Sequence, residues 1–260
     1  MKPRTEEFLY LMLWTFDRFA RPSFRNFEES FEGWAYRRGY RRQLAELERR
    51  QLLEGQSVRD HQRVHRLTEL GWLHAVGGRD PEAFWTEPWD GRWRLVLFDL
   101  PAKEETTRSK LRHSLQRQGF GWIQRSVWIT PRPLDRARSF LKGSDINVKS
   151  LLVMEARPVA GETDEQIVAG AWNFNKINEG YSLVMEILRQ CPPPGGRTAT
   201  QADVWRRWGV AEREAWLAAV QLDPLLPACL HPGNYLGSRA WELRKEVLRQ
   251  AGRQVAQFVW

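Results

Sequence analysis

The segment between residues 93 and 154 restricts the fold more than any other, because it alternates extended and helical patterns in a distinctive order. Residues 93–99 form an apolar run that ends before Pro101, which is typical of a buried strand. A helical pattern then runs to Gly119, and two strand-like stretches follow with a break near Arg125. The expected elements are, in chain order, a strand at 93–99, a helix at 104–118, two strands within 122–129, a helix at 133–141 and a strand at 148–154.

The order strand, helix, strand, strand, helix, strand is that of a ferredoxin-like βαββαβ domain, whose helices cover only one face of the sheet. The 260 residues of the chain leave room for small domains on both sides of it. After residue 161 the patterns are helical, and CPPPGGRT at 191–198 interrupts them. The helices are expected at 164–189, at 201–220 and from 238 onward. We therefore expect an α+β protein divided into residues 1–86, 87–160 and 161–260.

An arginine-rich stretch, WAYRRGYRRQLAELERR at 34–50, predicts an amphipathic helix in the first segment. At 100° per residue, four of its apolar or aromatic side chains fall within roughly 80° of one another, namely Tyr36, Tyr40, Leu44 and Leu47. The arginines on the opposite side are Arg38, Arg41, Arg42 and Arg49. One side of this helix is therefore expected to be buried, while the other presents guanidinium groups to solvent.

Two short strands are expected directly after this helix. Residues 52–55 and 63–68 have strand-like patterns around a polar loop, SVRDHQ, and residues 65–73 resemble the wing strand and following turn of winged-helix regulators. Two more helices are expected ahead of the arginine-rich one, at 5–20 and 26–31. Three helices followed by a hairpin describe a winged helix-turn-helix domain over residues 1–86.

Charge and cysteine content narrow the partners and the compartment. A formal net charge of +8 favours polyanionic partners, and between residues 34 and 66 nine arginines stand against four acids. Cys191 and Cys229 are the only cysteines, too few for a disulfide framework, which favours a reducing compartment and hence the cytoplasm. The apolar run near the N-terminus closes at Asp17, well short of the roughly 18 apolar residues that span a membrane. We expect a buried helix there and no membrane partner.

Several motifs resemble the PaaX-like repressors of phenylacetic acid degradation. The C-terminal signature is LDPLLP at 222–227, followed by Leu230, Pro232, Tyr235, Gly237 and Ala240. Residues 171–174 with Tyr181 resemble another helix of that family, and residues 93–131 resemble its central domain, with Arg108, Leu111, Leu115, Gly119 and Trp128 in place. The chain departs from the pattern at His231, where an apolar residue is expected, and at Tyr235, where tryptophan is expected.

The resemblance implies a dimeric transcriptional repressor that binds double-stranded DNA at an inverted-repeat operator. It also implies that the inducer is an aryl-acyl coenzyme A thioester. Our own hypothesis is that the ferredoxin-like domain forms the homodimer and that the helical segment 161–260 senses this effector. No other cofactor is implied, and the sequence does not identify the effector-binding residues. The departures at His231 and Tyr235 bear on the effector more than on the architecture.

Six arginines are the candidate DNA-binding residues. A recognition helix needs an apolar stripe to hold it and a polar face that enters the major groove, where arginine pairs with guanine or contacts phosphate. The candidates on the helix are Arg37, Arg38, Arg41 and Arg42, and those in the wing are Arg59 and Arg63. Within this set, we expect Arg38 and Arg42 to contact bases and Arg37 to contact phosphate. The alternative is that the arginines only form a solvated helix face without a ligand.

Two other interpretations of the sequence remain open. Asp99 ends a strand in a domain that resembles the small nucleases of CRISPR adaptation, so the alternative function is a metal-dependent nuclease that uses this aspartate. A capping or dimer-contact role for Asp99 is the simpler interpretation.

A zinc site is a second possibility that the sequence raises, through His61, His65 and His74. No cysteine lies nearby, so no metal site is expected. No nucleophile with a paired base is evident, and we expect no enzyme. A third hypothesis is a nucleic-acid-binding scaffold without an effector.

Overall fold

The computed structural model describes residues 41–58, 62–75, 78–99, 105–124, 126–134, 150–159, 161–193 and 199–258. The chain divides into two compact units. One unit takes in Met1–Asp80, Gly180–Leu217 and Leu236–Trp260, and the other takes in Pro81–Glu179 and Ala218–Tyr235. This division runs across residues 161–260, which the sequence assigned to a single domain.

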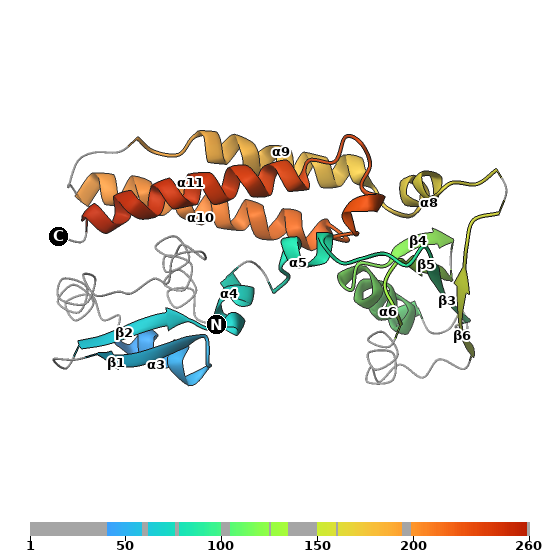
Figure 1. Cartoon of the computed structure of the whole chain (residues 1–260), viewed down its shortest axis with the longest axis horizontal. Coiled ribbons are helices and arrows are strands. Elements are labelled where there is room, and N and C mark those ends of the chain that lie inside the picture. Colours follow the sequence, from blue (N-terminus) through green and yellow to red (C-terminus); the bar gives the residue numbers. More distant parts are fainter. Residues whose placement is uncertain are drawn as a thin grey trace. The chain divides into compact units, whose positions relative to one another are not determined.

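A four-stranded antiparallel sheet forms the centre of the second unit (Figure 1). Its strands are β3 (Trp93–Asp99), β4 (Gly121–Gln124), β5 (Val127–Thr130) and β6 (Ser150–Ala156), and their order is β4-β5-β3-β6. Helix α6 (Glu105–Arg117) connects the first two of these strands. The ferredoxin-like prediction and the α+β class are thus confirmed. The second helix, predicted at 133–141, lies outside the described residues beyond Leu134.

Helix α6 packs on one face of this sheet because the two elements share an apolar cluster. The cluster consists of Val96, Phe98, Leu111, Leu115, Phe120 and Trp128, all of them buried. The helix ends where Gly119 adopts a φ of 83°, a left-handed conformation that glycine takes without a steric penalty. Phe120 then donates its backbone N–H to the Leu115 carbonyl at 3.1 Å, which directs the chain into β4.

The other face of the sheet is covered at one end by helix α8 (Asp164–Ala171). A Cβ at Gly121 would lie 2.7 Å from the Ala171 Cβ and from the Trp172 ring, so only glycine permits this close approach. The indole Nε1 of Trp93 donates to the Asp164 carboxylate at 2.7 Å. Away from α8, this face presents apolar side chains, including Leu152, which is 54% exposed.

The described part of the N-terminal segment contains α3 (Arg41–Arg49), a hairpin of β1 (Leu53–Val58) and β2 (Gln62–Leu67), and α4 (Glu69–Ala75). The helix and both strands agree with the predicted wing. The predicted turn after the wing is wrong, because residues 69–75 form a helix. The two helices predicted at 5–20 and 26–31 lie outside the described residues. A short helix, α5 (Pro81–Trp85), follows.

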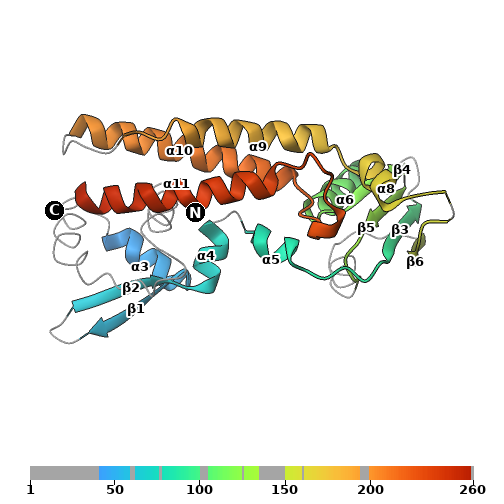
Figure 2. The same cartoon turned by 45° about the horizontal axis from the view of Figure 1, so that its top comes forward.

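Three long helices make up most of the C-terminal segment and lie side by side in both cartoon views (Figures 1 and 2). They are α9 (Phe174–Arg189), α10 (Ala199–Leu222) and α11 (Gly237–Phe258), with a 3-10 turn, η2 (Ala228–Leu230), between the last two. The sequence predicted one helix over 164–189, but α8 ends at Ala171, because Trp172 is extended. The Asn173 side chain then accepts the Lys176 backbone N–H at 3.0 Å and caps α9. No helix among the described residues is long and apolar enough to cross a membrane.

Candidate nucleic-acid interface

Helix α3 is held by two leucines on one side. Leu44 is buried and Leu47 is fully buried, which confirms the lower half of the predicted apolar stripe. Tyr36 and Tyr40, its upper half, lie outside the described residues. Leu52 and Leu53, just after the helix, are also buried. Because the apolar side faces inward, the opposite side of α3 is directed to solvent.

A tight corner joins α3 to the hairpin. Gln51 adopts a left-handed φ of 59°, and the Leu52 N–H donates to the Leu47 carbonyl at 2.9 Å. The Thr68 hydroxyl donates to the Gln51 carbonyl at 2.6 Å and accepts the Gly71 N–H at 2.9 Å. A Cβ at Gly71 would lie 1.9 Å from the Leu52 carbonyl oxygen. The end of α3, the start of β1 and the start of α4 therefore form one hydrogen-bonded junction.

The hairpin pairs from Leu53 and Leu67 at its base to Val58 and Gln62 at its tip. Of the two predicted wing arginines, Arg63 lies near this tip. Arg63 pairs with Ser57 near the tip end of β2, and Arg59 falls in the connection outside the described residues. The hairpin geometry therefore agrees with the predicted wing, and its contacts with DNA stay a prediction.

The outward side of α3 carries fewer available cations than its sequence suggests. Arg42 is exposed, as predicted. Glu46, one turn later, pairs with Arg49, and its carboxylate also accepts the Arg50 Nε–H at 2.6 Å. These two hydrogen bonds, first that of Arg49 and then that of Arg50, lower the pKa of Glu46. Arg49 is exposed but paired, whereas Arg42, near the beginning of the helix, is exposed and has no ion pair among the described residues.

The remaining candidates on this helix are only partly described. Arg41 is the first residue of α3, whereas Arg37 and Arg38 lie outside the described residues. The structure therefore does not test whether the six predicted arginines lie on one surface. Their role in DNA binding stays a prediction.

Asp99 is the last residue of β3 and pairs in register with Ser150 of β6. Within the part of the chain that the structure describes, no group of three or more histidines, cysteines or acids could hold a metal ion. His74 is exposed at the end of α4 and His65 lies in β2, opposite Gly55. His61 is outside the described residues. The nuclease interpretation of Asp99 therefore stays a hypothesis without a second observation.

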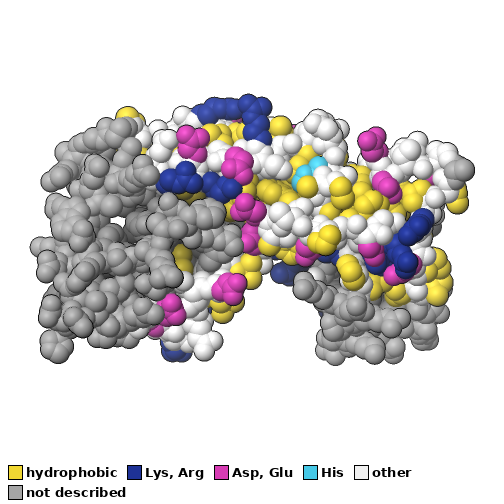
Figure 3. Space-filling view, in the orientation of Figure 1, with side chains coloured by type: hydrophobic (Ala, Val, Ile, Leu, Met, Phe, Trp, Pro, Cys, Tyr) yellow, Lys and Arg dark blue, Asp and Glu magenta, His cyan; other side chains and the backbone are white. Residues whose placement is uncertain are grey.

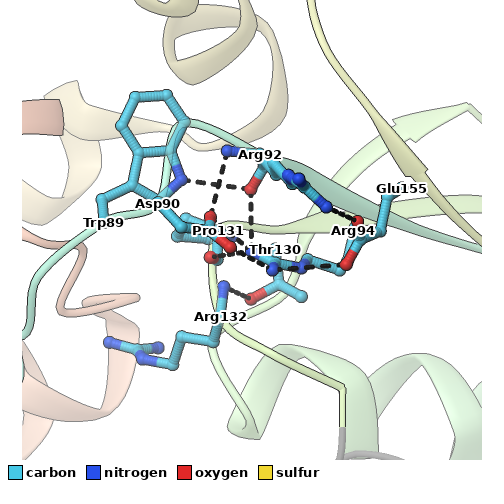
Figure 4. Close-up of polar contacts among 8 residues, drawn as sticks. All are labelled: Trp89, Asp90, Arg92, Arg94, Thr130, Pro131, Arg132 and Glu155. Atoms are coloured by element: carbon cyan, nitrogen blue, oxygen red, sulfur yellow. Dashed lines mark hydrogen bonds and ion pairs between the residues drawn. The ribbon is translucent and has the colours of Figure 1, made fainter.

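A buried arginine near the beginning of the interior strand β3 was not anticipated from the sequence (Figure 4). Arg94 is almost fully buried, and its guanidinium donates to Asp90 at 2.8 Å and to the Pro131 carbonyl at 3.0 Å. Arg92 donates to the Glu155 carboxylate at 2.7 Å. The hydrogen bond from Arg94 lowers the pKa of Asp90, and that from Arg92 lowers the pKa of Glu155. The four-residue spacing of Asp90 and Arg94 is the one sequence signal for this cluster.

The Asp-Pro signature of the sequence forms the corner between α10 and α11. Asp223 is buried, accepts the Leu225 N–H at 2.8 Å and accepts the Tyr235 hydroxyl at 2.5 Å. Leu225 adopts a left-handed φ of 52°. Arg132 donates to the Pro224 carbonyl at 3.2 Å and to Glu87 at 3.1 Å. Through these contacts the signature forms a turn between the two helices.

The two departures from the PaaX-like pattern touch each other in this corner. The rings of His231 and Tyr235 lie 4.2 Å apart, and Trp85 packs edge-on against both. His231 Nε2 donates to the Leu226 carbonyl at 2.9 Å. Burial lowers the pKa of His231, although the Leu226 carbonyl opposes this shift. The neutral imidazole therefore occupies a position at which an apolar residue is expected, because its polar atom is satisfied by the backbone.

The helical segment contains a buried ion pair that the sequence did not predict. Arg244 of α11 donates its Nε–H to Glu212 of α10 at 2.6 Å, and both side chains are almost fully buried. The Arg244 guanidinium lies over the Trp216 ring, 4.5 Å from its centroid. Burial raises the pKa of Glu212 and outweighs the opposing effect of Arg244. The pair links two helices at a distance of 32 residues in sequence, which no local pattern reveals.

Comparison with known proteins identifies the central domain. Residues 86–168 match the family described as "PaaX protein central Cas2-like domain", a segment that begins before β3 and ends within α8. The domain built on this sheet is therefore a Cas2-like domain. This match confirms, for the central segment, the resemblance to PaaX-like proteins noted in the sequence.

Two further comparisons concern the whole chain. A chain titled "Uncharacterized protein Rv0674 from Mycobacterium tuberculosis" aligns with 84% of this chain and 83% of its own length, with a TM-score of 0.49 and 20% identity. A search of the curated proteins gives no significant match.

Proposed function

We propose that this PaaX-like chain is a transcriptional regulator, a dimeric repressor that binds an inverted-repeat operator through α3 and the β1–β2 wing. The observation that carries the proposal is the arrangement of α3. Leu44 and Leu47 are buried while Arg42 is exposed on the opposite side, followed by a paired hairpin. A helix held in this way can lie in a major groove, and the hairpin can contact the adjacent backbone. The match of the central domain to PaaX proteins supports the same function.

The test is selection of bound sequences from random duplexes by the purified protein. We expect an enriched inverted repeat, because two identical recognition helices read two half-sites. The double variant Arg38→Ala/Arg42→Ala should lose this preference while its melting temperature stays unchanged. Arg189→Ala is the matched control, since Arg189 is also exposed but lies on α9. A full sequence preference in the double variant would reject α3 as the recognition helix.

We assign the dimer contact to the face of the sheet that α6 leaves uncovered. Leu152 and Met154 of β6 are 54% and 38% exposed and pair in register with Leu97 and Leu95 of β3. Cross-strand partners share a face, so these four side chains form a continuous apolar surface. Figure 3 shows hydrophobic side chains gathered where Figure 1 places β3 and β6. Contiguous exposed apolar surface of this kind commonly marks a protein interface.

The dimer is tested by sedimentation of Leu152→Asp. We expect a monomer, because a charge cannot be buried between two apolar sheet faces without a partner. Leu183→Asp is the control, since Leu183 is 51% exposed on α9. A Leu152→Asp variant that sediments as the wild type does would exclude this face as the dimer contact.

Release by an aryl-acyl coenzyme A thioester completes the proposal. An inducer must bind the conformation with low operator affinity more tightly than the other, since it can shift the equilibrium only by that difference. Phenylacetyl coenzyme A should therefore dissociate the DNA complex, whereas free coenzyme A should not. A complex that is indifferent to both would favour the scaffold hypothesis. Cleavage of the duplex with added Mg²⁺, lost in Asp99→Asn, would instead favour a nuclease.

A further inference from the structure

Much of the positive charge of the chain lies outside the arginine-rich segment. Residues 101–150 contain eleven lysines and arginines against four acids, a surplus of seven, while the whole chain has a net charge of +8. The surplus in residues 34–66 is five, nine arginines against four acids. The central domain is therefore at least as basic as the segment that contains the proposed recognition helix.

Helix α6 presents part of this charge on a single side. Leu111 and Leu115 are fully buried in the core and define its inner side. The residues on the outer side are Thr106, Lys110, His113 and Arg117, at positions i, i+4, i+7 and i+11, and all four are exposed. At 100° per residue they fall within about 60° of one another, and at 1.5 Å per residue they extend over roughly 16 Å. We call these four residues the α6 stripe.

Among the described residues, no acid pairs with the two cations of the α6 stripe, Lys110 and Arg117. In α3, Glu46 pairs with both Arg49 and Arg50, and in the central sheet Asp90 pairs with Arg94 of β3. By contrast, neither Lys110 nor Arg117 makes an ion pair with any residue in the described parts of the chain. From Thr106 to Arg117 the helix contains no acid at all. Two exposed cations are therefore available to a ligand that approaches from solvent.

The side chains on the outer side of α6 are suited to a polyphosphate ligand rather than to a protein partner. Its exposed neighbours Ser109 and Gln116 are polar, and between Thr106 and Arg117 no exposed side chain is apolar. Protein interfaces bury an apolar centre, which this side lacks. Hydroxyl, amide, lysine and arginine side chains are those that contact DNA phosphates. Duplex DNA carries one negative charge per roughly 1.7 Å of helix axis, so a cationic side roughly 16 Å long meets a dense row of phosphates.

We propose that the α6 stripe binds the sugar-phosphate backbone of duplex DNA and gives the central domain a DNA contact of its own. The contact is independent of base sequence, because phosphates are the same at every base pair. It rests on the proposed function in that DNA is the ligand, but it uses a different helix in a different unit of the chain from α3. In this regulator α3 would thus recognise the base sequence, and α6 would increase the affinity for DNA of any sequence.

The test is the salt dependence of binding to a random-sequence duplex, measured with the full-length protein by fluorescence anisotropy. The variant Lys110→Glu/Arg117→Glu removes both cations of the stripe. Its matched control is Lys176→Glu/Arg189→Glu, which makes the same change of charge at two exposed positions of α9. Because both variants change the net charge equally, a difference between them reports local contact and not long-range attraction.

We expect the slope of log K against log salt to fall by about 1.8 in the α6 variant, since each phosphate contact contributes about 0.9. Affinity at about 0.1 M salt should fall roughly tenfold or more for the same reason. Both quantities should change much less in the α9 control. In the neutral variant Lys110→Gln/Arg117→Gln, the salt slope and the affinity should also fall. An unchanged melting temperature of this variant would show that its fold is intact.

Equal slopes for the α6 and α9 variants would overturn the proposal. Equal displacement of the protein by polyglutamate and by DNA of the same charge would also overturn it, since an acidic protein would then be the better partner. The outcome is separable from the test of α3. If Arg38→Ala/Arg42→Ala loses sequence preference while the α6 variant keeps the wild-type slope, only the α6 proposal fails. If the α6 variant shows the reduced slope while Arg38→Ala/Arg42→Ala keeps its full sequence preference, only the assignment of α3 fails.

Discussion

Helices α3 and α6 are built alike and differ in how much of their charge is available. Each is anchored by two buried leucines, Leu44 and Leu47 in α3 and Leu111 and Leu115 in α6. Each directs cationic side chains away from its core. In α3, however, Glu46 pairs with Arg49 and Arg50, whereas the outer side of α6 between Thr106 and Arg117 has no acid. The number of arginines in a segment is therefore a poor measure of the charge that it offers to a ligand.

The two helices also differ in how they end. Helix α6 ends just before Gly119, which has a left-handed φ. A glycine at this position is a local stop signal that can be recognised in the sequence. Helix α3 ends at a corner that depends on Thr68 and Gly71, which are far along the chain in the next helix and its cap. The orientation of α3 is thus tied to the wing, while that of α6 is tied to its own sheet.

The largest expected effect is on the buried anchors of the two helices. Leu47→Ala and Leu111→Ala should each lower the free energy of unfolding by about 2–5 kcal/mol, because both side chains are fully buried. Urea denaturation followed by tryptophan fluorescence measures this change. Leu183→Ala is the control, since Leu183 is 51% exposed, and it should have little effect. A Leu47→Ala variant as stable as Leu183→Ala would mean that α3 is not anchored by its apolar side.

The corner of α3 should be the next most sensitive feature. Gly71→Ala places a Cβ 1.9 Å from the Leu52 carbonyl oxygen, so the backbone must shift, at about 1–3 kcal/mol. Gly170→Ala in α8 meets nothing within 4 Å and should stabilise the protein by up to about 1 kcal/mol, since alanine is the better helix former. Thermal unfolding compares the two. Opposite signs are expected, and equal effects would show that the Leu52–Gly71 approach is not required.

A smaller effect distinguishes Arg42 of α3, which has no ion pair among the described residues, from a paired arginine of the same helix. Arg42→Ala should weaken duplex binding roughly five- to tenfold at about 0.1 M salt, if this side chain contacts one phosphate or base. Arg49→Ala should weaken it less, because Glu46 already holds that guanidinium. Anisotropy titrations with one duplex measure both. A larger loss in Arg49→Ala would mean that the pair with Glu46 opens on binding.

At Glu46 itself the expected effect has the opposite sign, a gain of duplex binding. Glu46→Gln removes the acid that pairs with Arg49 and Arg50, so both become available to phosphate and the salt slope should steepen by up to about 1.8. Because the two arginines lower the pKa of Glu46 below its ordinary value of 4.5, the wild-type carboxylate stays ionised at neutral pH and the difference should persist there. The pair is lost only as the pH falls through the lowered pKa. An unchanged slope in Glu46→Gln would mean that this end of α3 lies away from the duplex.

The elements that sequence predicted well are those with local boundaries. The four strands of the sheet and α6 were found because proline, glycine and apolar runs delimit them. The break at Trp172 was missed because the helical pattern continues across it, and α4 was missed because its seven residues follow a strand without a strong signal. A helix boundary that depends on one extended residue or on packing is hard to predict, because the residue types around it do not change.

The charged sites were harder to predict for a different reason. Buried Arg244 and Glu212 lie on separate helices, and Glu155 reaches Arg92 across the sheet from 63 residues away. Such pairs depend on the assembled fold, so their residues look like ordinary surface charges in the sequence. Arg49 was placed correctly on the outer side of α3, but its neutralisation by Glu46 follows from side-chain contacts.

Photocrosslinking from α3 tests the central claim most directly, namely that its outer side lies against duplex DNA. Ala45 and Ser182 are both exposed, the first on α3 and the second on α9. Each is changed to cysteine, after Cys191 and Cys229 are replaced by serine, and is labelled with an azido crosslinker. With the duplex bound, position 45 should crosslink to DNA bases and position 182 should not. Crosslinking from position 45 that does not exceed that from position 182 would contradict the assignment of α3 to the groove.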